Sequence, residues 1–156
     1  MTFPKPVKAP KATARHHAAP STTPHKPPKA KTKRKKLPSI KTLREKADKL
    51  FSLYIRERDG RCITCGSTEN LQCSHYYGKK ARAAVRYNPF NAHAQCAKCH
   101  QAHHMSDPMR YADWMRVEYS GEALDKLELD SRAISKRDRV YYTQIIEYYE
   151  AKGGQK

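Results

Sequence analysis

Three features of the 156-residue sequence predict an α+β fold, with a small domain that is stabilised by a bound metal ion and flanked by helices. Two Cys-x-x-Cys pairs, at 62–65 and 96–99, have the spacing of ligands for one zinc ion. Apolar residues recur at helical spacing on both sides of these pairs, whereas the pieces next to the first pair are short and strand-like. The N-terminal segment is rich in proline and positive charge, which predicts a disordered basic tail.

The predicted tail covers residues 1–38. Residues 1–40 contain eleven Lys or Arg, eight of the ten prolines and no Asp or Glu, so they supply +11 of the net charge of +17. Such a composition cannot bury enough apolar surface to offset the entropy of ordering the backbone. The tail is either a solubilising segment or an attachment to nucleic-acid phosphates, and the unopposed charge favours the second.

The remainder is predicted to be a zinc-containing domain at 39–129 and a C-terminal helix region at 130–156. The first helix is expected at 42–58, where Thr42 and Glu45 form a capping-box pattern ahead of an apolar stripe. The apolar pieces 61–64 and 71–74 predict a hairpin around a turn at 66–70. A basic loop at 77–89 follows, and further helices are expected at 96–105, 108–119, 122–129 and 136–151.

The last helix carries four of the ten tyrosines. Tyr141, Ile145 and Tyr148 share one helical stripe, which favours packing against the first helix or against a second copy in a homodimer. Stacking of these tyrosines on exposed DNA bases is the alternative interpretation. Trp114, on an earlier helix, is interpreted as a core residue.

Four of the five cysteines are expected to bind a structural zinc: Cys62, Cys65, Cys96 and Cys99. In so small a domain the metal would take over part of the role of a hydrophobic core. Cys73 is interpreted as a small buried apolar residue. Metal-type spacing fits a reducing compartment, and the sequence has neither a membrane-spanning stretch nor a signal-peptide core.

Polar residues around the second cysteine pair form a specific order. His75 ends the second predicted strand, Asn91 precedes Cys96, and His100 directly follows Cys99. Each histidine alone is most often an ordinary polar residue, but the joint order resembles HNH, or ββα-metal, nucleases with a zinc knuckle. Residues 41–150 resemble more closely the NinG (Rap) recombination proteins of lambdoid phages, through the segments IRERD (55–59), CITCG (62–66), SHY (74–76), VRYN (85–88), NAHAQC (91–96) and GEALD (121–125).

The resemblance implies an HNH-like core and a metal-dependent DNA endonuclease. Its substrates would be branched recombination or replication intermediates, such as Holliday junctions, in the cytoplasm of a phage-infected bacterium. His75 would be the general base, Asn91 would brace the loop that orients it, and His100 with His104 would bind the catalytic ion, Mg²⁺ or another divalent ion such as Mn²⁺. Phosphate contacts are expected from the basic loop, at Lys79, Lys80, Arg82 and Arg86.

One position departs from the HNH pattern. Many HNH enzymes have Asp immediately before the base, and here that residue is Ser74. The resulting metal site is mostly neutral, and imidazole ligands admit metals other than Mg²⁺. His93 and His103 have no assigned role and are interpreted as surface residues.

Two other functions fit the same residues. One is a non-catalytic zinc-containing protein that binds nucleic acid, and the other is a generic HNH endonuclease without preference for branches.

Overall fold

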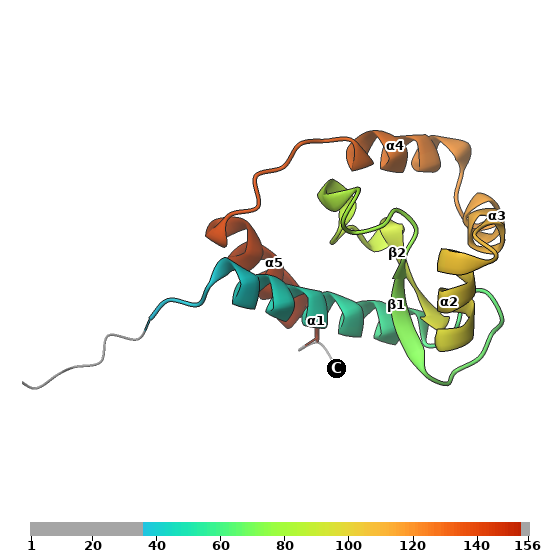
Figure 1. Cartoon of the computed structure of the whole chain (residues 1–156), viewed down its shortest axis with the longest axis horizontal. Helices are drawn as coiled ribbons and strands as arrows, with labels where there is room; N and C mark the ends of the chain where they lie inside the picture. The colour runs from blue at the N-terminus through green and yellow to red at the C-terminus, as the bar shows by residue number, and fades with distance from the viewer. Residues whose placement is uncertain (1–35, 154–156) are drawn as a thin grey trace, which may run out of the picture. The chain divides into compact units, whose positions relative to one another are not determined.

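The structure, a computed structural model, describes residues 36–153, so the predicted tail lies almost wholly outside the described part (Figure 1). Mixed α and β structure is confirmed, mostly helical with one small sheet. The helices are α1 (Ile40–Asp59), α2 (Ala97–Met105), α3 (Met109–Glu118), α4 (Gly121–Ser131) and α5 (Arg139–Gly153); the strands are β1 (Leu71–His75) and β2 (Ala92–Cys96). Among the described residues, no helix is long and apolar enough to span a membrane.

The predicted hairpin is wrong. β1 pairs antiparallel with β2, from Leu71 opposite Cys96 to His75 opposite Ala92. Residues 61–64 form a turn instead, because the first cysteine pair bends into a knuckle: Gly66 N–H donates to the Cys62 carbonyl at 2.8 Å and has φ 78°. A left-handed backbone at this position explains why the glycine follows the pair.

The first helix is confirmed, but its start differs from the capping-box prediction. Ser39 is the N-cap, and its Oγ accepts a hydrogen bond from the Thr42 backbone N–H at 3.1 Å. The helix therefore begins at Ile40, and Thr42 lies inside its first turn. It ends where predicted, at Gly60, which has φ 64° and donates its N–H to the Arg56 carbonyl.

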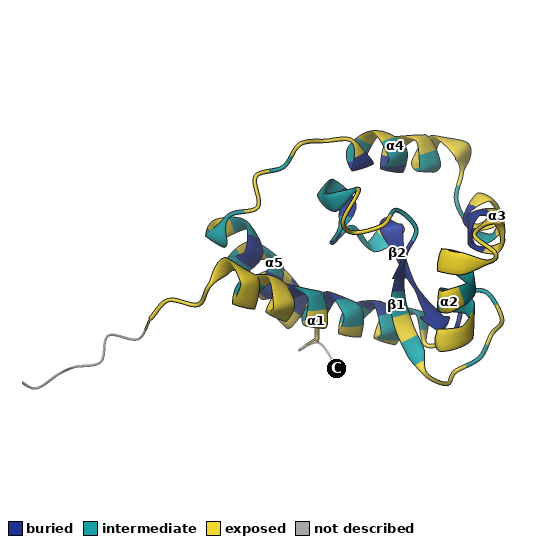
Figure 2. Cartoon of the chain, viewed as in Figure 1, coloured by how far each residue is buried: buried dark blue, intermediate teal, exposed yellow. Residues whose placement is uncertain are grey.

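Two hydrophobic cores lie on the two sides of the sheet (Figure 2). The first joins the buried face of α1 to α5 and includes Phe51, Ile55 and Tyr87. The second joins the loop before β2 to α3 and α4 through Val85, Tyr111 and Leu127. Since β2 is buried along its whole length, the strands separate two packed layers.

The buried stripe of α5 is displaced by one residue from the prediction. Tyr142, Ile146 and Tyr149 are buried against α1, whereas Tyr148 is 52% exposed. Both rows have the same helical spacing and both are apolar, so periodicity alone could not choose between them. Tyr149 fixes the choice, because its hydroxyl donates to the buried Tyr87 carbonyl at 2.9 Å.

The expected division at residues 129–130 falls inside α4, which continues to Ser131. The last helix begins at Arg139 rather than 136, and the Asp138 carboxylate accepts a hydrogen bond from the Tyr141 N–H at 3.1 Å.

Candidate functional site

The cysteines of the two Cys-x-x-Cys pairs lie together. Cys62 and Cys65 come from the turn after α1, Cys96 ends β2, and Cys99 lies in the first turn of α2. Their four sulfur atoms all lie within 4.8 Å of one another, with Cys65 Sγ 3.7 Å from Cys96 Sγ. Tetrahedral zinc with Zn–S bonds of about 2.3 Å needs sulfur separations of roughly 3.8 Å. The cluster can therefore hold a structural metal such as zinc.

The thiols of the knuckle do not ionise equally, because burial and the neighbouring cysteines raise the pKa of Cys99. Burial opposes ionisation of Cys62, but backbone N–H groups of Cys96, Cys65 and Thr64 outweigh it and lower the pKa of the thiol to about 6. A thiolate is the form that coordinates zinc. The same turn that creates the knuckle thus also stabilises the ligand.

A pocket of about 400 Å³ lies beside the knuckle, between β1, the basic loop and α2. It brings together the three histidines predicted for catalysis and metal binding, His75, His100 and His104, with Cys73 beside them. Lys79 and Lys80 line it from the loop, and both are exposed. Segments that are far apart in the sequence therefore supply one concavity, which has two lysines beside three histidines.

His75 is the deepest of the three histidines, with 8% of its surface exposed. Its Nε2 lies 2.9 Å from the Arg86 carbonyl, so Nε2 carries the proton and donates it. Within residues 36–153, Nδ1 has no hydrogen-bond partner. Burial lowers the pKa of His75 to about 4, which keeps the ring neutral at physiological pH.

His100 and His104 stand one helical turn apart on α2, with their Nε2 atoms 3.1 Å apart. Nδ1 of His100 donates to Gln72 Oε1 at 2.7 Å, which leaves a lone pair on Nε2. Partial burial and the neighbouring histidines lower the pKa of His100, so it too favours the neutral form that binds metals. Sequence reasoning did not find Gln72, whose position opposite Gln95 says nothing about a contact with α2.

Asn91 is fully buried and braces the loop between the strands. Its side-chain amide donates to the Tyr77 and Val85 carbonyls at 3.1 Å each, and its Oδ1 accepts from the Tyr77 N–H at 2.8 Å. The Asn91 carbonyl accepts from the Tyr76 N–H. The residue therefore ties both ends of the segment after His75 without lining the histidine pocket.

The predicted phosphate contacts divide into two groups. Lys79 and Lys80 are exposed at the pocket, and Arg82 is half-buried near it in sequence but outside its lining.

Arg86 forms an ion pair with Asp48 of α1 at 2.5 Å, and its Nη1 donates to the Lys79 carbonyl. The pair lowers the pKa of Asp48 despite its partial burial and raises that of Arg86. Asp48, which sequence reasoning missed, thus anchors the residue whose carbonyl holds His75.

Ser74 points away from the histidine pocket. Successive strand residues face opposite sides, and Ser74 stands opposite His93 in the register. It is fully buried, and its Oγ has no hydrogen-bond partner among the described residues. Its carbonyl accepts from the Tyr111 hydroxyl.

The interpretation of His93 as a surface residue is wrong. It is 1% exposed, with Nδ1 2.8 Å from the Tyr111 hydroxyl and Nε2 2.8 Å from the Tyr119 hydroxyl. Burial lowers its pKa to about 4. His103 is half-buried against the Tyr111 ring. The sequence did carry one signal for this burial, because His93 lies between two small apolar residues, Ala92 and Ala94.

Comparisons with known proteins agree with the resemblance. Residues 5–155 match the family described as Bacteriophage Lambda NinG protein. The NinG protein of Escherichia phage lambda is 32% identical over 88 residues, which cover 54% of this chain and 43% of that protein. The Salmonella phage P22 protein is 32% identical over 93 residues, covering 56% and 45%. No solved structure matches.

The chain aligns with less than half the length of each of these relatives. The family match nevertheless spans nearly the whole sequence. The chain therefore belongs to the bacteriophage lambda NinG protein family.

Proposed function

We propose that this protein is a metal-dependent DNA endonuclease of the HNH type that acts on branched DNA. The observation that carries the proposal is the histidine pocket. Three imidazoles from β1 and α2 line one cavity with lysines beside it, close to a cysteine cluster that fits zinc. Few structural roles require three histidines in a basic cavity.

His75 would act as the general base. Its Nε2 is committed to the Arg86 carbonyl, so Nδ1 remains to take a proton from an attacking water. The new bond forms between the water oxygen and phosphorus, and the bond from phosphorus to the leaving sugar oxygen breaks. The proton passes from water to Nδ1, and the leaving oxygen is protonated by solvent. A pKa of about 4 keeps Nδ1 unprotonated before the reaction.

His100 and His104 would hold the catalytic divalent ion, Mg²⁺ or another divalent ion such as Mn²⁺, although imidazole ligands suit Ni²⁺ better than either. Bound there, the ion would neutralise charge on the phosphate and on the leaving oxygen. The hydrogen bond from His100 to Gln72 orients the ring for this role.

Lys79, Lys80 and Arg82 would bind the DNA backbone. The two lysines are exposed beside His75, where they can neutralise phosphates on either side of the cut. Arg86 serves better as a support for His75, because its guanidinium is already paired with Asp48. Asn91 would keep the loop in place during the reaction.

The branched substrate follows from the resemblance to recombination proteins. A homodimer would allow symmetric cutting of two strands, and the host cytoplasm is the compartment where such DNA occurs. A net charge of +17 suits a polyanionic partner.

The test is cleavage of a four-way junction, a flap and a linear duplex by one zinc-loaded preparation with Mg²⁺, Mn²⁺ or Ni²⁺. Wild type should cut the junction in preference to the duplex, and His75→Ala should lose cutting while retaining junction binding. Gln101→Ala is the matched control, since this exposed residue lies on the same helix as His100 but outside the pocket. Unchanged cleavage by His75→Ala would refute the mechanism, and equal cutting of all three substrates would refute the branch preference.

A non-catalytic zinc protein that binds nucleic acid is the second candidate. One observation favours it: among residues 36–153, only the four cysteines form a group of three or more side chains within ligand distance. Junction binding without cleavage under any of the three metals would select this function.

A further inference from the structure

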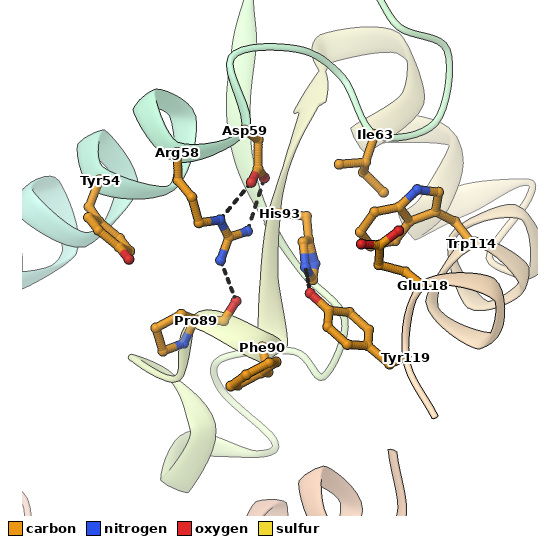
Figure 3. Close-up of a pocket in the computed structure, with 10 residues that line it drawn as sticks. All are labelled: Tyr54, Arg58, Asp59, Ile63, Pro89, Phe90, His93, Trp114, Glu118 and Tyr119. Carbon is orange, nitrogen blue, oxygen red and sulfur yellow. Dashed lines mark hydrogen bonds and ion pairs between the residues drawn. The ribbon is translucent and has the colours of Figure 1, made fainter. Parts of the chain in front are cut away.

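A second pocket, of about 540 Å³, lies at the outer edge of β2 (Figure 3). At this edge the Ala94 N–H donates a hydrogen bond to the Asp59 carboxylate, and the Ala94 carbonyl accepts one from the Ile63 N–H. Asp59 and Ile63 both line this pocket. None of its lining residues belongs to the histidine pocket. Its volume lies within the range of small-molecule sites, about 300–1,000 Å³.

The lining is dominated by aromatic rings. Figure 3 shows His93 at the centre, with Tyr54, Phe90, Trp114 and Tyr119 around it. The rings touch in series: Phe90 with Tyr119 at 5.6 Å between centroids, Tyr119 with Trp114 at 6.1 Å, and Trp114 with His93 at 4.6 Å. The pocket thus offers several ring surfaces at one place.

Phe90 is presented to solvent in a fixed position. Its side chain is 57% exposed, although a large apolar ring of this kind is usually buried. It stands in a short 3₁₀ turn, where Pro89 precedes it and Asn88 Oδ1 accepts its N–H at 2.9 Å. Arg58 donates to the Pro89 carbonyl and fastens the turn to α1. A rigid exposed ring costs little entropy when it binds a partner.

The charged groups of the pocket leave no place for a phosphate. Arg58 donates to Asp59, to the Pro89 carbonyl and to the Ala92 carbonyl, so most of its N–H groups are already engaged. Asp59 accepts from Arg58 and from the Ala94 N–H. Glu118, at the side of Trp114, has no ion pair among the described residues (Figure 3). The pocket therefore suits a flat, uncharged ring with hydrogen-bond donors.

We propose that this aromatic pocket binds an unpaired nucleobase of single-stranded or branched nucleic acid. A base is planar and uncharged and stacks on aromatic side chains whatever its sequence. The polyanion to which it is attached matches the net charge of the chain. The proposal rests on nucleic-acid binding, one part of the proposed function, and does not depend on cleavage.

Trp114 is the single tryptophan of the chain, so its fluorescence reports on this pocket alone. The full-length, zinc-loaded protein is titrated, without added divalent ion, with a single-stranded ten-mer and with an abasic ten-mer of equal charge. We expect quenching and tighter binding only with the base-bearing strand, by about tenfold, the order of one stacked base. Phe90→Ala should abolish this difference and leave abasic binding unchanged.

Tyr148→Ala is the matched control, because this ring is also about half exposed but lies on α5. Equal binding of the two strands, or loss of the difference in Tyr148→Ala rather than Phe90→Ala, would overturn the proposal. A peptide of residues 20–38 that quenches Trp114 only when Phe90 is present would assign the pocket to the proline-rich tail and also overturn it. Failure of both strands to bind would also overturn it, whereas the proposed function stands or falls on junction binding and cleavage.

Discussion

Two buried histidines lie on the two strands of one sheet and differ in what surrounds their ring nitrogens. His93 has both nitrogens bonded to tyrosine hydroxyls, whereas His75 has one bonded to a carbonyl and lines a pocket with the other unpartnered among the described residues. Burial lowers the pKa of each to about 4. A shifted pKa therefore does not distinguish them. The unpartnered nitrogen and the two further histidines in its pocket make His75 the candidate base, whereas both nitrogens of His93 are occupied.

The largest effect on structure and activity should come from a change that displaces both His75 and His93. Cys99→Ser should lose the metal and unfold the region around the knuckle, because Cys96 of the same cluster ends β2. Metal binding in such small domains contributes several kcal/mol of folding free energy, up to about 10 or more. Metal content and circular dichroism would measure this. Cys73→Ser, outside the cluster, should retain one metal per chain; unchanged metal content in Cys99→Ser would contradict the zinc site.

The second prediction separates the two histidines by activity. His75→Ala should lower junction cleavage by at least about 100-fold, the usual contribution of a general base. At saturating junction, His93→Ala should lower the cleavage rate per folded molecule by less than about threefold, because His93 does not line the histidine pocket and a loss of base binding would change affinity instead. Single-turnover rates, corrected for the folded fraction, provide the measurement. Comparable losses in the two variants would break the distinction.

The third prediction reverses the order for stability. His93→Ala removes two buried hydrogen bonds and leaves a cavity between Tyr111 and Trp114, so it should cost about 2–4 kcal/mol of unfolding free energy. His75→Ala should cost less, because it removes one hydrogen bond rather than two. Urea unfolding at pH 7.5 compares them. A larger loss for His75→Ala would show that His75 is the structural residue.

The sequence predicted the helices and the cysteine cluster, because both depend on local spacing. Cys62 and Cys65 require only a turn, and the first helix requires only an apolar stripe and Gly60. The strand pairing failed because Ile63 lies in the metal-binding turn, and the true partner of β1 comes after a long loop. A short apolar piece does not identify its distant partner.

The histidine pocket was predicted only through a family resemblance, and its supports were missed altogether. Gln72 and Asp48 contact the site across 28 and 38 residues of sequence, and neither belongs to a recognisable motif. His93 was misassigned for a related reason. Its partners, Tyr111 and Tyr119, are on and just after a helix whose packing on the sheet is decided by tertiary structure.

The fourth prediction concerns pH. The pKa of His93 is about 4 in the folded protein and about 6.5 when unfolded, so the unfolded chain binds the extra proton. Its contribution to stability is complete above pH 6.5, falls as the pH is lowered towards 4, and falls no further below that. Arg58 opposes protonation and Asp59 favours it, while the tyrosine partners stay neutral.

Wild type should therefore lose more stability than His93→Ala between pH 7 and 4.5, with a slope that differs by up to about one proton. Both proteins lose the metal at low pH, so this effect cancels when the unfolding free energy of His93→Ala is subtracted from that of wild type. Unfolding free energies measured at closely spaced pH values would show it. Parallel pH profiles would mean that the pKa of His93 is the same in the folded and the unfolded protein.

The smallest effect should come from the support of His75. Asp48→Asn removes the carboxylate that pairs with Arg86 and accepts from the Tyr87 hydroxyl, so the loop carrying the Arg86 carbonyl should loosen. We expect a loss of about 1–3 kcal/mol in stability, because Arg86 is left half-buried without its counterion. Cleavage should fall several-fold through kcat rather than KM, since the ring of His75 loses orientation and not phosphate contacts.

Asp113→Asn is the control: it breaks an exposed ion pair with Arg116 and should change stability by less than about 1 kcal/mol, with cleavage unaffected. If Asp48→Asn raised KM alone, Arg86 would belong to the phosphate-binding residues, and the ring of His75 would have to be oriented by other contacts.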